Sequence, residues 1–294
     1  EGVLSVTRST FNGNSATTGG GAINNYLSTT HPVTVTSSTF YDNSATAHGG
    51  AVYNDNSGTL TIANSTFSVN SAPEGGSLSN AWGATLNVTN CTFSASGTST
   101  SGALRNFDGT VTLRNSILAY DGGDNCHNSD TLTANTYNLA SDTSCGSAKL
   151  TTLANLKLGP LQNNGGSTQT MALLAGSSAI GAGNNNTCAF PVGAPSYGAG
   201  GYDQSGTHRP QGISCDSGAF EFQSTTSTFN SAGSQDGWVL ESGENSAKGG
   251  SLDAAATTLR LGDDNARKQY RSILSFETSS LPDNAVIMKV VLKV

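Results

Sequence analysis

The sequence predicts an all-β protein, and over most of its length a right-handed, three-stranded parallel β-helix. Gly, Ser, Thr and Asn dominate the composition, with 36 Gly and only 11% charged residues among 294. These residue types are poor helix formers and favour turns. Hydrophobic residues still make up 35% of the chain and recur at regular positions, which argues against disorder. The third observation is a repeat of 25 to 29 residues, an interval typical of solenoid proteins.

Each repeat supplies three short strands separated by turns. An alternating strand such as Leu60 to Ile62 comes first, an aromatic strand such as that of Phe67 follows, and a small-residue turn leads to an aliphatic strand at Leu78. The aromatic slot is filled in successive repeats by Phe11, Phe40, Phe67, Phe93 and Leu118. We expect each strand to pair with its equivalent one coil away, roughly 4.8 Å distant, so that like side chains stack in columns.

One polar column is expected at the turn before the aromatic strand. Asn64, Asn90 and Asn115 occupy this slot, while Arg8 and Ser37 fill it in the first two repeats. Asn tolerates a left-handed backbone, and its amide can bond to the amides above and below it in a stack. The sequence therefore predicts an asparagine ladder at these three positions.

The cysteines predict two disulfides. Beyond the repeats the chain becomes rich in Asp, Asn and Gly, and Cys126 and Cys145 flank one short strand-like piece of it, while Cys188 and Cys215 bracket a later loop. Local pairs of this kind are expected to close loops in an oxidising compartment. Cys91 stands in a repeat slot that holds Ser elsewhere, so we expect it to remain a free, buried packing residue.

Charge and hydropathy exclude two classes of partner. The net charge is −7 and no cluster of Lys and Arg is present, so nucleic acid is not an expected partner. No apolar stretch is long enough to cross a bilayer, which predicts no membrane span in this chain. Strand-like patterns at both ends, including Val286 to Val294, lead us to expect that the polypeptide extends further.

Candidate catalytic and metal-binding residues are few. Arg105, on the outward side of its strand, is the best candidate for a lyase base, but it is expected to stand alone, and the acids of the repeats fall in different slots of different coils. His48 and His127 lack a second ligand at zinc spacing, so no zinc site is predicted. A weak calcium site could form in one Asp- and Gly-rich loop, for which an exposed acidic loop is the alternative; its acids are Asp121, Asp124 and Asp130.

Several motifs follow one another in a fixed order from the last repeat onward. They are Ser116-Ile117-Leu118, the Cys126 to Cys145 segment with Tyr137-Asn138-Leu139, Leu158 to Gly166, Thr168-Gln169-Thr170, Gly176 to Ile180, Asp203-Gln204, Arg209-Pro210 and Cys215 to Glu221. Together they resemble the choice-of-anchor Q domain, and the resemblance covers close to 220 residues. The resemblance implies a bacterial surface or secreted protein with a pectate-lyase-like β-helix and no established catalysis.

The C-terminal part has a second set of motifs. They are Phe229, Asp236-Gly237-Trp238, Leu259 to Gly262, Tyr270 to Phe276, Leu281-Pro282 and Ala285-Val286-Ile287. These residues resemble the beginning of a DNRLRE domain. The resemblance implies part of a β-sandwich. Three regions are thus expected: β-helix repeats over 1–120, an irregular end of the β-helix with the two disulfides over 121–222, and the sandwich over 228–294.

Three functions remain open from the sequence. The first is an extracellular or cell-surface scaffold or adhesin of a bacterium, binding polysaccharides or other glycans and needing no cofactor apart from a possible calcium ion. The second is a subunit of an extracellular filament in which neighbouring copies complete one another's open strand edges. The third, a polysaccharide lyase or glycoside hydrolase, rests on the fold alone.

Overall fold

The computed structural model describes residues 3–26, 32–95, 102–120, 123–134, 137–224, 227–232, 234–254, 256, 258–280 and 291–292. The chain divides into two compact units, Glu1–Ser224 and Thr225–Val294. The first unit is an all-β parallel solenoid with an irregular region packed along it, and the second is a small antiparallel sheet. The all-β class and the parallel coils predicted from the repeats are confirmed.

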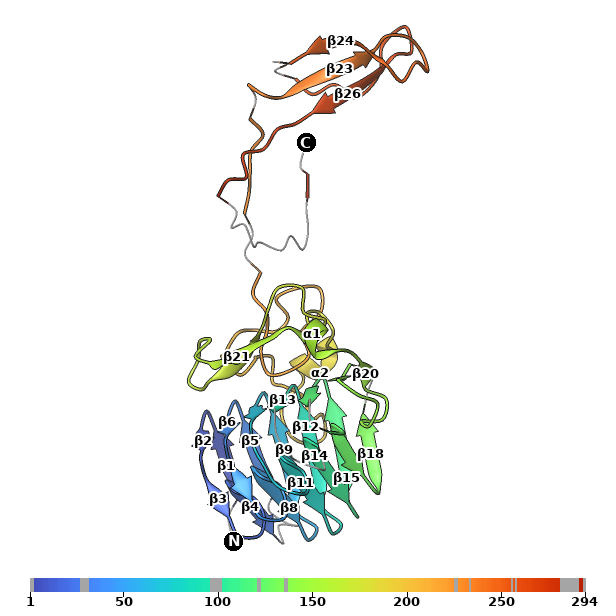
Figure 1. The fold of residues 1–294 in the computed structure, drawn as a ribbon. Helices are drawn as coiled ribbons and strands as arrows, with labels where there is room; N and C mark the ends of the chain where they lie inside the picture. The colour runs from blue at the N-terminus through green and yellow to red at the C-terminus, as the bar shows by residue number, and fades with distance from the viewer. Residues whose placement is uncertain are drawn as a thin grey trace. The chain divides into compact units, whose positions relative to one another are not determined.

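Three parallel sheets form the solenoid (Figure 1). The first sheet contains β1 (Ser5–Thr7), β5 (Val33–Thr36), β9 (Thr59–Ala63), β12 (Thr85–Thr89), β15 (Thr110–Arg114) and β18 (Thr131–Ala134). The second contains β2 (Thr10–Asn12), β6 (Thr39–Tyr41), β10 (Thr66–Ser68), β13 (Thr92–Ala95), β16 (Ile117–Tyr120), β19 (Leu139–Ala140) and β20 (Lys149–Leu150). The third contains β4 (Ile23–Tyr26), β8 (Val52–Asp55), β11 (Leu78–Ala81), β14 (Leu104–Phe107) and β17 (Cys126–Asn128). A short pair, β3 (Ser15–Ala16) and β7 (Ser44–Ala45), lies between the first two coils.

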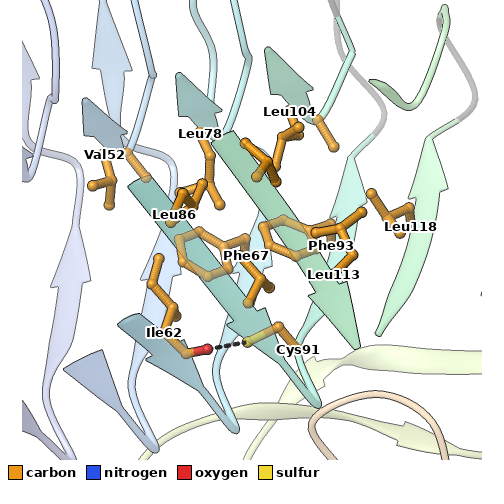
Figure 2. Close-up of a cluster of buried hydrophobic side chains, with 14 of the residues drawn as sticks. Val52, Ile62, Phe67, Leu78, Leu86, Cys91, Phe93, Leu104, Leu113 and Leu118 are labelled. Atoms are coloured by element: carbon orange, nitrogen blue, oxygen red, sulfur yellow. Dashed lines mark hydrogen bonds between the residues drawn. The ribbon is translucent and has the colours of Figure 1, made fainter. Parts of the chain in front are cut away.

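The strand register confirms the stacked apolar columns. Phe67 pairs with Phe40 on one side and with Phe93 on the other, and its ring centroid lies 4.7 Å from each of theirs. Figure 2 shows Phe67 and Phe93 among Leu86, Leu113 and other core side chains. Because coils repeat at the strand spacing of a sheet, equivalent side chains meet face to face and the core is a continuous stack.

Two asparagine ladders, neither expected from the sequence, run through the solenoid. In the third sheet each side-chain amide donates to the next carbonyl oxygen at 2.7 to 2.9 Å, in the order Asn25, Asn54, Asn80, Asn106 and Asn128. A second ladder joins Asn14 to Asn43 at 2.8 Å and Asn43 to Asn70 at 3.0 Å. These amides also bond backbone carbonyls, so they satisfy polar groups in the buried turns.

The predicted column of Asn64, Asn90 and Asn115 has another arrangement. All three residues adopt a left-handed backbone, with φ of 47°, 49° and 47°. Only Asn115 and Asn90 bond through their side chains, at 3.3 Å. The Asn64 amide instead donates to the carbonyl of Ala199, and the Asn90 amide donates to that of Asp216. The side chains of this column therefore mainly bind the irregular region and do not form a continuous ladder.

The irregular region lies along the coils and caps the second sheet (Figure 1). Its regular elements are α1 (Leu153–Leu156), β21 (Leu158–Gln162), β22 (Thr170–Leu173) and α2 (Asn185–Ala189). Gln204 is the main point of attachment: its amide nitrogen lies 2.9 Å from the Thr39 hydroxyl, and its carbonyl oxygen accepts from Thr66 at 2.7 Å. Outward Thr residues of the second sheet thus bind the region instead of facing solvent.

A buried ionic cluster holds the irregular region together. The Arg209 guanidinium lies 2.9 Å from the Glu221 carboxylate and donates to the carbonyls of Asp216 and Gly218. Asp203 accepts from the Glu221 backbone N–H at 2.8 Å. Burial, and then the neighbouring Glu221 charge, raises the pKa of Asp216 to about 6. The sequence motifs Asp203-Gln204, Arg209-Pro210 and Cys215 to Glu221 therefore have structural roles in this fold.

The raised pKa of Asp216 predicts a pH dependence of stability. In the folded chain Asp216 holds its proton up to about pH 6, whereas the ordinary carboxyl value is 3.8, so the folded state binds more protons between these values. Stability contributed by this group is therefore lost as the pH rises through that window. We expect the free energy of unfolding of Asp216→Asn to rise relative to the wild type as the pH goes from about 4 to about 7. Urea unfolding at several pH values measures the difference, and a constant difference would contradict the prediction.

Both predicted disulfides are present. The sulfur atoms of Cys126 and Cys145 are 2.00 Å apart, and those of Cys188 and Cys215 are 2.06 Å apart. Cys91 is free and fully buried, and its thiol lies 3.8 Å from the carbonyl oxygen of Ile62 (Figure 2). Burial raises the pKa of the Cys91 thiol to about 12, so it is an unreactive packing residue.

The described part of the second unit is one antiparallel sheet. Its strands β23 (Gly237–Glu241), β24 (Gly249–Asp253), β25 (Gly262–Asp263) and β26 (Gln269–Ile273) follow the order β24-β23-β26-β25. The Trp238 and Tyr270 rings meet edge to face at 5.1 Å. The strand expected at Val286 to Val294 lies outside the described residues apart from 291–292.

Across the described ranges, no helix is long and apolar enough to span a membrane.

Candidate functional site

The outward face of the third sheet carries a cluster of aromatic and charged side chains. Along β8, β11 and β14 the core and ladder residues alternate with residues on the opposite face of the sheet. Tyr53, Ser79 and Arg105 are direct neighbours in the parallel register, so they form one column across three coils. His48 and Glu74 are bridge partners in the turns that precede β8 and β11.

Ionic contacts connect three coils of this face. The Glu74 carboxylate lies 2.7 Å from Nδ1 of His48 and 3.2 Å from the Arg105 guanidinium. The Arg105 side chain is 14% exposed, whereas that of Glu74 is 37% exposed. The same carboxylate oxygen of Glu74 therefore contacts both the His48 ring and the Arg105 guanidinium, and the Glu74 side chain is partly exposed to solvent.

Aromatic contacts complete the arrangement. The His48 ring stacks on Tyr53 at 5.1 Å, and the Arg105 guanidinium lies 4.7 Å above the Phe107 ring. Trp82 meets Phe107 edge to face at 5.2 Å and is 55% exposed. Asp55 and Trp82 lie close to the Tyr53 side chain, and burial followed by the Asp55 charge raises the pKa of Tyr53 to about 12.

We call this group of residues the third-sheet cluster. Its members are His48, Tyr53, Asp55, Glu74, Trp82, Arg105 and Phe107. Ser79 lies in the column between Tyr53 and Arg105 and is 1% exposed. Its hydroxyl has no hydrogen-bond partner among the described residues.

Turn geometry places the exposed members of the cluster. Trp82 has a φ of 52°, a left-handed conformation that directs the chain out of β11. Gly49 and Gly75 also have positive φ, and a Cβ atom at either would lie within 2.1 Å of a backbone oxygen of the following strand. Only Gly fits these two positions. The turns place His48 and Glu74 beside each other at the beginning of β8 and β11.

The structure corrects the expectation that Arg105 stands alone. Arg105 is paired with Glu74 and packed on Phe107, so it is neither a lone solvated arginine nor an unengaged base. The sequence did contain the signal, because His48 and Glu74 each directly precede a pair of glycines and so share a slot.

The calcium candidates are not assembled into a site by the described part of the chain. Asp121 lies outside the described residues. Asp124 and Asp130 are exposed, and Asp130 lies in the turn between β17 and β18, where its carboxylate is 3.4 Å from the Thr131 hydroxyl. No group of three or more His, Cys, Asp or Glu side chains suited to a metal ion occurs among the described residues.

Fold and cluster together define a parallel β-solenoid protein with an aromatic, acidic site on the outside of its coils. The model of the Chlamydia polymorphic membrane protein repeat matches residues 8–26 and 37–55, which lie in the first two coils and include His48 and Tyr53. Comparison with curated proteins and with solved structures finds no match.

Proposed function

We propose that this chain is a bacterial cell-surface or secreted adhesive module that binds glycans at the third-sheet cluster. The match to a repeat of a Chlamydia surface membrane protein and the two disulfides support an extracellular location. The resemblance to the choice-of-anchor Q and DNRLRE domains supports the same location and a three-part organisation, with a right-handed β-helix followed by part of a sandwich.

The observation that carries glycan binding is the exposure of Trp82 beside fixed polar groups. A Trp ring that is 55% exposed and packed edge to face on Phe107 presents an apolar face to solvent, and Trp and Tyr are enriched at interfaces. Glu74, Asp55 and His48 surround this part of the sheet with hydrogen-bonding groups. An aromatic surface with a few placed polar groups is the composition of a ligand site, and sugars present both an apolar ring face and hydroxyls.

Replacing Trp82 with Ala should abolish or strongly weaken binding to a glycan. The purified chain would be tested against immobilised neutral and acidic glycans, with retention measured for each. Tyr137→Ala is the matched control, because Tyr137 is also an exposed aromatic, 41% exposed, but precedes β19 in the second sheet. We expect a loss of about tenfold or more in affinity for Trp82→Ala and none for Tyr137→Ala. Equal behaviour of the two variants would place the site elsewhere.

The same purified chain can be used to test the two alternative functions, a polysaccharide lyase and a filament subunit. A lyase would release unsaturated uronate from polygalacturonate or alginate, which an absorbance assay detects. The pairing of Arg105 with Glu74 makes a free Arg base there unfavourable, so we expect no release. A filament subunit would give particles much larger than a single 29.8 kDa chain in light scattering.

A further inference from the structure

We infer that the third-sheet cluster selects an uncharged glycan chain that lies along the solenoid axis, and that it rejects uronate and sulfated chains. This inference rests on the proposed glycan binding and adds the chemical class of the ligand and its direction. It follows from the charge of the cluster, from the engagement of its one guanidinium and from the placement of its aromatic rings.

Carboxylates outnumber guanidinium groups in the cluster. Asp55 and Glu74 supply two carboxylates, and Arg105 supplies one guanidinium. Asp108, in the turn directly after β14, is exposed and adds a third carboxylate beside Phe107. The whole chain also carries a net charge of −7. A polyanion would meet repulsion on approach and at the site.

Arg105 is not available to neutralise an acidic sugar. Its guanidinium contacts the Glu74 carboxylate at 3.2 Å and covers the Phe107 ring at 4.7 Å, and the side chain is 14% exposed. Binding a uronate there would require breaking this ion pair and leaving Glu74 next to a second carboxylate. Recognition of a carboxylate usually relies on an Arg whose donors are free to form two parallel bonds.

The remaining groups suit sugar hydroxyls. The Glu74 carboxylate, whose side chain is 37% exposed, can accept hydrogen bonds from sugar hydroxyls. A site built to bond hydroxyl groups discriminates strongly in favour of ligands that carry them, because its polar groups are otherwise left unpaired.

The aromatic residues extend the site across four coils. Tyr26 is the register neighbour of Asp55, is 59% exposed and lies on the outward face of β4. Ala81 pairs with Phe107, and Trp82 follows Ala81 directly. From Tyr26 to Phe107 there are three coil steps, or roughly 14 Å at the strand spacing. An extended chain running along the axis can contact this row, whereas a single sugar ring cannot.

The test uses the intrinsic fluorescence of Trp82 in the full chain. Trp82 and Trp238 are the two tryptophans, so Trp238→Phe, a change in the other compact unit, leaves Trp82 as the only reporter. This variant is titrated with cellohexaose, xylohexaose, mannohexaose and chitohexaose as neutral probes, and with hexagalacturonate and a heparin hexasaccharide as acidic ones. We expect at least one neutral probe to change the emission at about one tenth or less of the concentration that an acidic probe needs.

Glu74→Gln supplies the matched change in charge. The substitution keeps the shape of the side chain, removes one negative charge and weakens the interaction of residue 74 with the Arg105 guanidinium. We expect binding of hexagalacturonate to strengthen by about tenfold.

The outcomes separate the inference from the proposed function. Tighter binding of an acidic probe by the Trp238→Phe variant, or no gain in hexagalacturonate binding with Glu74→Gln, overturns the inference and leaves glycan binding intact. No response to any of the six probes, in fluorescence or in calorimetry, overturns both. A response to trimers equal to that for hexamers contradicts the extended arrangement along the coils.

Discussion

Arg209→Ala is expected to lower the free energy of unfolding by about 3 to 5 kcal/mol, the usual cost of removing one partner from a buried ion pair. Arg209 is 1% exposed, and its guanidinium bonds Glu221 together with the carbonyls of Asp216 and Gly218. Its removal leaves the carboxylates of Asp203, Asp216 and Glu221 buried without a cation. Urea unfolding monitored by circular dichroism measures the loss.

The controls for this change distinguish charge from packing. Arg209→Met restores much of the apolar volume and is expected to recover little stability, because the carboxylates still lack a partner. Lys149→Ala, which removes an exposed cation at β20, should cost less than about 0.5 kcal/mol. A full recovery with Met would show that packing and not charge governs the site. We also expect faster amide exchange across 203–221 in Arg209→Ala, since this cluster joins the irregular region to the coils.

Phe67→Ala is expected to lower the free energy of unfolding by about 3 to 5 kcal/mol through loss of apolar burial and creation of a cavity. Phe67 is fully buried and stacks at 4.7 Å on both Phe40 and Phe93, so no neighbour can fill the space without breaking its own stack. Chemical unfolding gives the value directly.

Phe107→Ala serves as the partner experiment. Phe107 is half-buried on the outward face, and its register neighbour is Ala81, so its loss should cost less than about 1.5 kcal/mol. The same change removes the ring that supports Trp82 and Arg105, and we expect it to weaken glycan binding. Equal losses of stability at Phe67 and Phe107 would mean that the two faces of the solenoid are wrongly assigned.

Only part of the candidate site can be predicted from the sequence. Alternation along a strand decides which side chains face away from the core, and it places Arg105 on the outward face. The contacts of Glu74 with His48 and Arg105 join residues of three coils. The distances from Glu74 to His48 and to Arg105 depend on the position of each turn residue relative to the following strand. This position varies because turn lengths differ between coils. The burial of Ser79 likewise depends on neighbours in adjacent coils.

The sequence by itself determined the coils, the apolar columns and both disulfides. In a solenoid each strand pairs with its equivalent in the next repeat, so periodicity along the chain translates directly into register, as for Phe40, Phe67 and Phe93. The Asn25 to Asn128 ladder also follows the repeat. It is hard to distinguish in the sequence, because Asn is abundant at other positions of the same repeats.

Only the tertiary structure decided where the irregular region lies and what its motifs do. Gln204 contacts Thr39 across 165 residues and Thr66 across 138. No periodic pattern specifies such pairs, because they depend on the complementarity of two surfaces formed by separate parts of the chain. The same holds for Asn64 and Asn90: their local sequence suits a ladder, but carbonyls at Ala199 and Asp216 offer better-placed acceptors once the region docks. Local chemistry sets which groups can bond, and the fold decides which of them meet.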